Sequence, residues 1–128
     1  MASNSNWHPW AGRVLTGLPA LGMLASAGMK LSQKPEMVAN FQKFGFAPGL
    51  LTPIAVVELL CTILYLIPRT AALGAILLTG YLGGAVVTHL RAGEPVFAPI
   101  ILGILVWGGL FARDSRVRAL IPLRGPEA

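Results

Sequence analysis

The chain alternates between long apolar segments and short polar connections. Residues 14–29, 70–90 and 95–112 contain no Asp, Glu, Lys or Arg, and residues 44–68 contain only one charged side chain, Glu58. A helix that crosses the apolar core of a bilayer needs about 20 such residues. The pattern therefore predicts four transmembrane helices, at about residues 11–32, 49–67, 70–91 and 95–112.

The connection between the first two predicted helices has a helical pattern of its own. Pro35 can begin a helix and Gly45 can end it. The apolar side chains between them fall on one face at helical spacing: Met37, Val38, Phe41 and Phe44. We expect a short amphipathic helix, which either lies on the membrane surface or packs as a lid over the mouth of the bundle.

The two remaining connections are short. Pro68-Arg69 and Ala92-Gly93-Glu94 are so short that the helices they join must be antiparallel neighbours. The predicted fold is all-α: a single domain over residues 1–128, forming an integral membrane four-helix bundle with a short amphipathic helix between its first and second spanning helices.

The first apolar segment has an alternative interpretation as a signal peptide, because Ala25-Ser26-Ala27 has the small side chains of a cleavage site. A signal peptide begins with positive charge, and the residues before Arg13 carry none. The transmembrane interpretation is therefore favoured.

The composition supports the membrane interpretation. Apolar residues make up 55% of the chain and charged residues 12%, and the mean hydropathy is +0.69, outside the range of ordinary soluble domains. The net charge of +5 does not indicate nucleic-acid binding, because most basic residues stand singly at the ends of apolar segments. With a single cysteine, Cys61, the chain can form neither an intrachain disulfide nor a Cys-x-x-Cys redox pair.

The basic residues also predict an orientation. Four spanning helices put both termini on one side, which then carries Arg13, Arg69, Arg113, Arg116, Arg118 and Arg124. The other side carries Lys30, Lys34, Lys43 and Arg91, together with Glu36 and Glu94. Because basic residues are enriched in cytoplasmic connections, we expect a multi-pass inner-membrane protein with both termini in the cytoplasm.

Small residues indicate where helices approach one another. Gly80 and Gly84 form a Gly-xxx-Gly step in the third segment, and Gly22 and Ser26 are four residues apart in the first. Such steps permit close contact between helices. The favoured interpretation is packing within one bundle, and the alternative is a homo-oligomer through Gly80 and Gly84.

Polar side chains within the apolar segments are the candidates for function, because ionisable groups in hydrocarbon usually face the bundle interior. Helical spacing aligns four polar residues on one face of the second predicted helix: Glu58, Cys61, Thr62 and Tyr65. The same spacing aligns Tyr81, Thr88 and His89 on the third. These helices are antiparallel neighbours, so we expect the two polar faces to meet.

The depth of these groups depends on where the second helix begins. Thr52-Pro53 is a good N-cap and first-turn pair, and a start there puts Glu58 about 8 Å below the helix end, within reach of the Lys30 side chain. His89 lies nearer the outer end of its helix. The predicted ligand site is a polar cavity open to the outer side, formed by Lys30, Glu58, Tyr65, Tyr81 and His89; no metal site is predicted.

Each of these residues also has a structural interpretation. Glu58 can be a protonated acid that fixes helix register, and Lys30 can extend its ammonium to the interface. Tyr65 can be an interfacial aromatic residue, like Trp7, Trp10 and Trp107, and His89 an interface residue. A haem site would need an axial pair, but His8 and His89 fall on opposite membrane faces in the predicted topology.

The order of short motifs along the chain is similar to that of a known family. The motifs are Gly-Met-Lys-Leu (28–31), Phe41 to Gly45 with a following proline, Glu58-Leu59, Ile67-Pro68-Arg69-Thr70, residues 83–89 (GGAVVTH), Trp107 and Arg113-Asp114. Over residues 11–118 the chain resembles the DoxX-like family of small four-helix membrane proteins. The resemblance implies a bacterial inner-membrane bundle with Lys30, Glu58 and His89 at the family's polar positions.

The resemblance does not fix an activity. It connects the chain with thiosulfate:quinone oxidoreduction and redox-stress complexes, while distant relatives are receptor-assembly chaperones. We therefore carry a main hypothesis, a quinone-linked redox accessory subunit in which Glu58 and His89 exchange protons with quinone while Lys30 holds Glu58 ionised or polarises a carbonyl. A redox partner protein would have to supply the electrons, because the chain has no electron-carrier motif of its own.

Two alternatives remain. The first is a non-enzymatic binding or assembly protein whose polar residues specify packing or hold a lipid-like ligand. The second is a transporter subunit that uses Glu58 as a proton site. The sequence leaves open whether the protein is an enzyme, because it contains no P-loop, nucleophile elbow or metal-ligand spacing typical of soluble enzymes.

Overall fold

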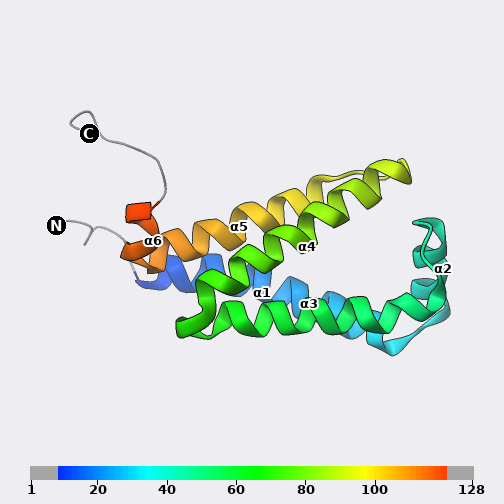
Figure 1. The fold of residues 1–128 in the computed structure, drawn as a ribbon, viewed down its shortest axis with the longest axis horizontal. Helices are drawn as coiled ribbons and strands as arrows, with labels where there is room; N and C mark the ends of the chain where they lie inside the picture. Colours follow the sequence, from blue (N-terminus) through cyan, green and yellow to red (C-terminus); the bar gives the residue numbers. More distant parts are fainter. Residues whose placement is uncertain (1–8, 121–128) are drawn as a thin grey trace.

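The computed structural model describes residues 9–120, and its regular elements there are all helical (Figure 1). They are α1 (Pro9–Ser32), α2 (Pro35–Lys43), α3 (Leu51–Leu66), α4 (Ala71–Arg91), α5 (Phe97–Arg113) and α6 (Ser115–Leu120), with 3-10 turns η2 (Pro48–Leu50) and η3 (Pro68–Thr70). The all-α prediction is confirmed. Three residues used in the sequence analysis lie outside the described part of the chain: Trp7, His8 and Arg124.

The four longer helices run along the long axis of the molecule (Figure 1). α1 packs against α3 and α5, and α4 also packs against α3 and α5, so each of the four has two neighbours. α2 lies at one end of this arrangement and α6 at the other (Figure 1). The polar face predicted for α3 therefore points into a space that the other three helices enclose.

The helix between α1 and α3 was predicted correctly. α2 begins at Pro35, whose missing N–H needs no partner in the first turn. It ends where Phe44 and Gly45 donate their N–H groups to Asn40 and Gln42. Gly45 has a φ of +90°, in the left-handed region where glycine is unstrained.

The predicted start of α3 at Thr52-Pro53 is wrong. The turn η2 leads directly into the helix at Leu51, so the chain is already helical before Thr52 and needs no side-chain cap there. The Thr52 hydroxyl instead accepts a hydrogen bond of 2.7 Å from the Gln33 side chain. Glu58 consequently lies about 10 Å along the helix from its first residue.

α6 is a helix that was not predicted from the sequence. Asp114 precedes this helix, and its Oδ1 accepts a 2.9 Å hydrogen bond from the backbone N–H of Arg116. This is the bond that an N-cap side chain makes to the first turn. In the sequence, Asp114-Ser115 is the pair of residues that indicates a helix start at this position.

The glycines that let helices approach closely are not those predicted. A Cβ added to Gly80 or Gly84 would meet nothing within 4 Å, so packing of this step inside the molecule is wrong. A Cβ on Gly74 would lie 2.5 Å from the Tyr65 Cα and closer still to its backbone nitrogen. Gly109 is similar, with a Cβ position 2.7 Å from the Thr16 hydroxyl oxygen. α3 and α4 therefore make their closest contact at Gly74, next to the η3 turn.

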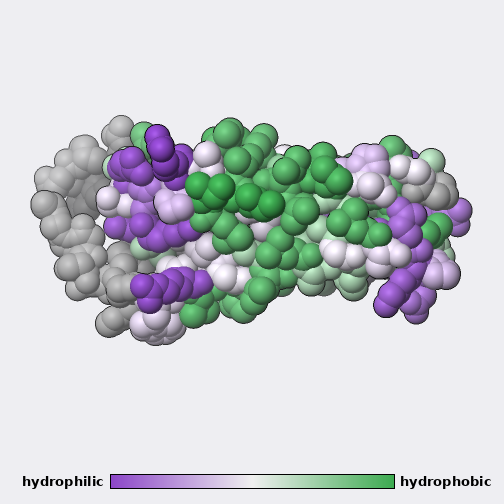
Figure 2. Space-filling view, turned by 90° about the horizontal axis from the view of Figure 1, so that it is seen from below, coloured by the Kyte–Doolittle hydropathy of each residue, from purple (hydrophilic) through white to green (hydrophobic). Residues whose placement is uncertain are grey.

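On the face shown in Figure 2, apolar side chains form a band across the middle of the molecule, and polar side chains gather at both ends. Residues Trp10–Ser32 and Pro68–Arg91 are long and apolar enough to cross a membrane. α3 and α5 are apolar but shorter, with 16 and 17 residues. Many large side chains of the band are exposed, including Leu18, Leu21, Leu60, Ile76 and Ile104. An apolar surface of this extent is typical of contact with lipid or protein.

We predict that Gly74→Ala strongly destabilises the fold, whereas Gly80→Ala does not. The added methyl group at position 74 overlaps the backbone of α3, and overpacking of this kind costs about 1–3 kcal/mol or more. At position 80 there is space, and alanine is favoured over glycine in a helix by up to about 1 kcal/mol. Thermal unfolding of the purified variants in detergent measures both effects. Equal unfolding temperatures for the two variants would contradict this packing.

Candidate functional site

The predicted polar face of α3 is its buried face. Glu58, Cys61, Thr62 and Tyr65 are all buried. Glu58 is only 2% exposed although it carries a carboxylate. The Thr62 hydroxyl donates a 2.7 Å hydrogen bond to the Glu58 backbone carbonyl one turn earlier, so this threonine is satisfied within its own helix.

Lys30, near the end of α1, forms an ion pair with Glu58. The Nζ–Oε1 distance is 2.7 Å, and the lysine side chain is 12% exposed. Ser26 lies one turn before Lys30 on the same face of α1; its hydroxyl accepts a 2.7 Å hydrogen bond from Nζ and donates one of 3.3 Å to Glu58 Oε1. The carboxylate thus has two donors from α1.

The third partner of Lys30 comes from α4. Nζ donates a 3.0 Å hydrogen bond to the Tyr81 hydroxyl oxygen. An ammonium has three protons to donate, and here Ser26, Glu58 and Tyr81 accept them. We call Ser26, Lys30, Glu58 and Tyr81 the polar network. It joins α1, α3 and α4 through groups whose hydrogen bonds are largely met inside the chain.

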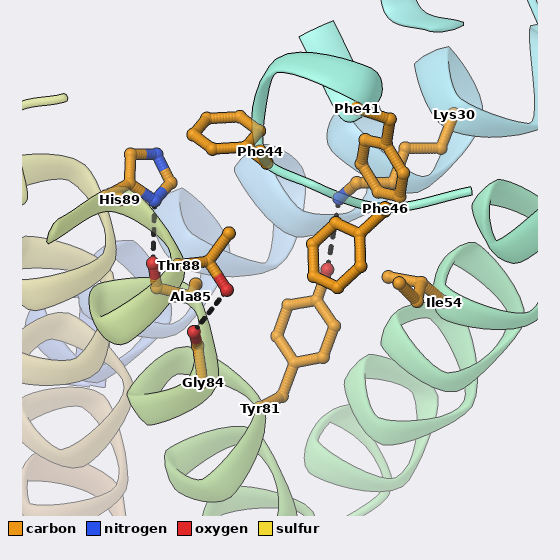
Figure 3. A pocket seen from close by; sticks show the side chains of 10 residues that line it. All are labelled: Lys30, Phe41, Phe44, Phe46, Ile54, Tyr81, Gly84, Ala85, Thr88 and His89. Atoms are coloured by element: carbon orange, nitrogen blue, oxygen red, sulfur yellow. Dashed lines mark hydrogen bonds between the residues drawn. The ribbon is translucent and has the colours of Figure 1, made fainter. Parts of the chain in front are cut away.

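A cavity of about 290 Å³ lies beside the polar network. Its walls come from α1, α2, the α2–α3 connection, α3 and α4 (Figure 3): Lys30, Phe41, Phe44, Phe46, Ile54, Tyr81, Gly84, Ala85, Thr88 and His89. Lys30 and Tyr81 point toward each other at its floor, and the three phenylalanine rings lie on the side of α2 (Figure 3). We call it the aromatic cavity. Of the two interpretations of α2, the lid agrees with this arrangement.

His89 lines the aromatic cavity near the end of α4. Its Nδ1 lies 2.7 Å from the Ala85 carbonyl oxygen, and its ring centre lies 4.8 Å from that of Phe44. A carbonyl oxygen can only accept, so Nδ1 carries the proton and Nε2 is the free acceptor of the neutral ring. The Thr88 hydroxyl is engaged with the Gly84 carbonyl in the same way. His89 therefore lines the aromatic cavity, and its Nε2 is available to accept a hydrogen bond.

Tyr65 lies apart from the aromatic cavity, and its assignment to a shared site is corrected. The side chain is 0% exposed, so its interpretation as an interfacial aromatic residue is also wrong. Its hydroxyl donates a 2.7 Å hydrogen bond to the Val106 carbonyl of α5. The Arg113 guanidinium covers its ring at 4.8 Å and donates to its backbone carbonyl at 2.8 Å. Spacing placed Tyr65 on the buried face, but it lies two turns from Glu58.

Ser26 belongs to the polar network but was not predicted as a site residue. Its spacing of four residues from Lys30 was the available signal, but it was interpreted as a packing step with Gly22. Phe46 was missed as a cavity wall because it follows the end of α2. Its ring centre lies 5.3 Å from that of Phe41, which extends the aromatic side of the cavity past the helix.

A second ion pair ties α2 to the connection between α4 and α5. Lys43 Nζ lies 2.5 Å from Glu94 Oε2, at an exposed position. The hydrogen bond and positive charge of Lys43 lower the pKa of the Glu94 carboxyl below its ordinary value. Together with the contact between Phe44 and His89, this pair holds the lid to the far side of the aromatic cavity.

Within residues 9–120, no three His, Cys, Asp or Glu side chains lie together in a way that could hold a metal ion. The chemistry that the described site can perform is that of hydrogen-bond donors, one buried ion pair and an imidazole. Such groups can bind a polar head and move protons.

A sequence model of the DoxX-like family matches residues 14–109. The chain belongs to the DoxX-like family. The matched region contains the whole polar network and His89 and ends before α6. Family membership and the two helices long enough to cross a bilayer make this a small membrane protein. Searches of curated proteins and of solved structures gave no match.

We predict that the ion pair of this DoxX-like protein is strongly coupled. Glu58→Gln and Lys30→Met each leave a charge buried without its partner, which costs about 3–5 kcal/mol. The double variant removes both charges and should lose clearly less than the sum of the two. Unfolding of the four proteins in detergent provides the double-mutant cycle. Glu94→Gln, which breaks the exposed pair, is the control and should change stability little; additive losses at positions 30 and 58 would argue against the pair.

The tether of the lid should weaken in acid. The pKa of Glu94 is lowered in the folded protein, so its contribution is complete above the ordinary glutamate value and is lost as the pH falls through the lowered one. Hydrogen exchange of α2 in the wild type and in Glu94→Gln, compared at each pH, tests this. We expect faster exchange in the variant at pH 7, and a difference that shrinks as the pH falls through the lowered pKa of Glu94. A difference that stayed constant in acid would mean that the carboxylate charge is not what holds α2.

Proposed function

We propose that this DoxX-like protein spans the bacterial inner membrane with α1, α3, α4 and α5 as a four-helix bundle, with both termini in the cytoplasm. The apolar band and the antiparallel order of the helices support the spanning arrangement. The orientation is supported by the end that carries α6, which holds five arginines among the described residues: Arg13, Arg69, Arg113, Arg116 and Arg118. Basic residues are enriched on the cytoplasmic side of membrane proteins.

We further propose that the protein is a redox accessory subunit that binds a quinone in the aromatic cavity. The observation that carries this proposal is the composition of the cavity: three phenylalanine rings on one side, with Tyr81, Lys30 and His89 opposite or beside them. A quinone head is a planar ring with carbonyl oxygens at its edge. It fits between aromatic side chains that pack against its faces and two donors at its edge, the Tyr81 hydroxyl and Nε2 of a protonated His89. Lys30 acts through Tyr81, because its three protons are already donated within the polar network.

The site residues would transfer protons to the quinone, and a partner protein would transfer the electrons. Reduction of a quinone to a quinol takes two electrons and two protons. A redox partner protein with its own electron carrier would supply the electrons. Tyr81, linked to the Lys30–Glu58 pair, could pass a proton to one oxygen, and protonated His89 could pass a proton to the other from Nε2.

A second candidate is a binding or assembly protein without catalytic activity. The observation that favours it is the closure of the polar network, in which Lys30 already has three acceptors within the chain. A network satisfied in this way can serve to fix the packing of α1, α3 and α4. In this case the aromatic cavity would hold a lipid-like ligand of no particular redox chemistry.

Self-association is compatible with either candidate. The space around Gly80 and Gly84 can accept a helix of a second copy. Gly84 also lines the aromatic cavity, so such a helix would become part of the cavity wall. A homo-oligomer through these glycines would also reduce the exposed apolar surface of the chain.

Binding of a short-chain benzoquinone tests the proposal. We expect it to raise the unfolding temperature of the wild type in detergent and to bind Tyr81→Phe about tenfold more weakly, because one hydrogen bond is worth about 1–1.5 kcal/mol. Tyr65→Phe is the matched control: it loses the other tyrosine hydroxyl, which lies outside the aromatic cavity, and should keep the quinone-dependent shift.

Three outcomes separate the candidates. A shift that depends on Tyr81 but not on Tyr65 supports the quinone site. An equal shift from a chain of similar length without a quinone head supports the lipid-like ligand of the second candidate. If the quinone stabilises none of the three proteins, the quinone proposal is refuted.

A further inference from the structure

A second cavity, of about 330 Å³, lies at the end of the molecule opposite the aromatic cavity. It is enclosed by the η3 turn, the start of α4, the end of α5 and the start of α6. Three of the residues that line it are apolar: Pro68, Ala71 and Leu110. The others are polar or charged: Arg113, Asp114, Ser115 and Arg116. We call it the arginine pocket.

The two arginines of this pocket are held differently. Arg113 is fixed, because one of its terminal nitrogens donates a 2.8 Å hydrogen bond to the Tyr65 carbonyl and its guanidinium stacks over the Tyr65 ring. A guanidinium has five N–H groups, so this bond leaves others for a ligand. Arg116 has a side chain that is 85% exposed, and its Nε reaches Asp114 Oδ1 only at 3.4 Å. It can turn toward a ligand at little cost.

One carboxylate also lines the pocket, and its charge is already engaged. Asp114 Oδ1 accepts the backbone N–H of Arg116 at 2.9 Å as well as the longer contact from Nε. Partial burial disfavours its charge, but these hydrogen bonds prevail and hold the pKa of Asp114 below its ordinary value. The lining therefore carries two positive charges against one negative charge. Arg69, next to Pro68 at the same end, adds to the positive surroundings without lining the pocket.

We propose that the arginine pocket binds the phosphate group of an anionic phospholipid. Guanidinium groups recognise phosphate through paired N–H donors, and the Ser115 hydroxyl can add a third donor. The lining combines apolar and cationic residues, and it comes from the ends of helices at the α6 end of the molecule. Polar side chains gather at that end, next to the apolar band (Figure 2). A headgroup bound there could lay its acyl chains along the apolar band, which a free phosphate ion cannot do.

Lipid titration of the full chain in mild detergent tests this proposal, with bound lipid counted by native mass spectrometry. Phosphatidylglycerol should bind more tightly than phosphatidylcholine, which has the same phosphate but no net charge. Arg116→Gln should weaken phosphatidylglycerol binding about fivefold, the effect of one arginine near an anionic lipid. Arg69→Gln is the matched control, since it removes the same charge from the same end outside the pocket; it should weaken binding less than twofold.

Arg116 is the better position for the test, because Arg113 holds the Tyr65 carbonyl and its loss could disturb the fold. Equal weakening by Arg116→Gln and Arg69→Gln would show diffuse charge attraction and overturn the pocket. If inorganic phosphate displaced the lipid at a similar concentration, and did so through Arg116, the site would be one for free phosphate and the lipid assignment would fail. No preference for phosphatidylglycerol over phosphatidylcholine would also overturn it.

Discussion

The buried ion pair between Lys30 and Glu58 constrains the rest of this fold. Many of the other contacts between the helices are apolar and carry no charge that a change of register would leave unpaired. The ion pair favours the observed register, since a slip of α1 along α3 would leave two charges without partners in an apolar setting. Tyr81 extends the same constraint to α4. Three of the four long helices are thus fixed by four polar side chains.

The aromatic cavity is a consequence of this arrangement. The polar network joins α1, α3 and α4 at one level, and α2 covers the cavity that lies beside it. Phe41 of α2 is buried, and the exposed Lys43 reaches Glu94 in the connection between α4 and α5. The cavity therefore has a polar floor that holds its shape and a lid attached by weaker, exposed contacts.

Much of this architecture followed from the sequence, for reasons that also explain the misses. Charge spacing located the four long helices, and helical periodicity identified the buried face of α3, because both depend on local sequence alone. Periodicity predicts which face of a helix is buried but not which residues of other helices it contacts. Tyr65 was therefore assigned to the same site as Glu58, although it contacts α5. Glycine steps look alike in a sequence, yet only Gly74 meets a backbone across the α3–α4 interface. The reach of Lys30 to Glu58 was predictable because a long side chain tolerates a small error in helix start.

The two ends of the molecule use charge in opposite ways. At the lid end, Lys30 is matched inside the chain by Glu58, and Lys43 is matched by Glu94. At the other end, arginines exceed the single described carboxylate, Asp114, so positive charge is left for surroundings that can neutralise it. A closed network can keep its geometry whether or not a ligand is bound, whereas an open cationic end gains most from anionic surroundings. Such a division suits a protein whose lid end selects a ligand and whose arginine end fixes its position in the bilayer.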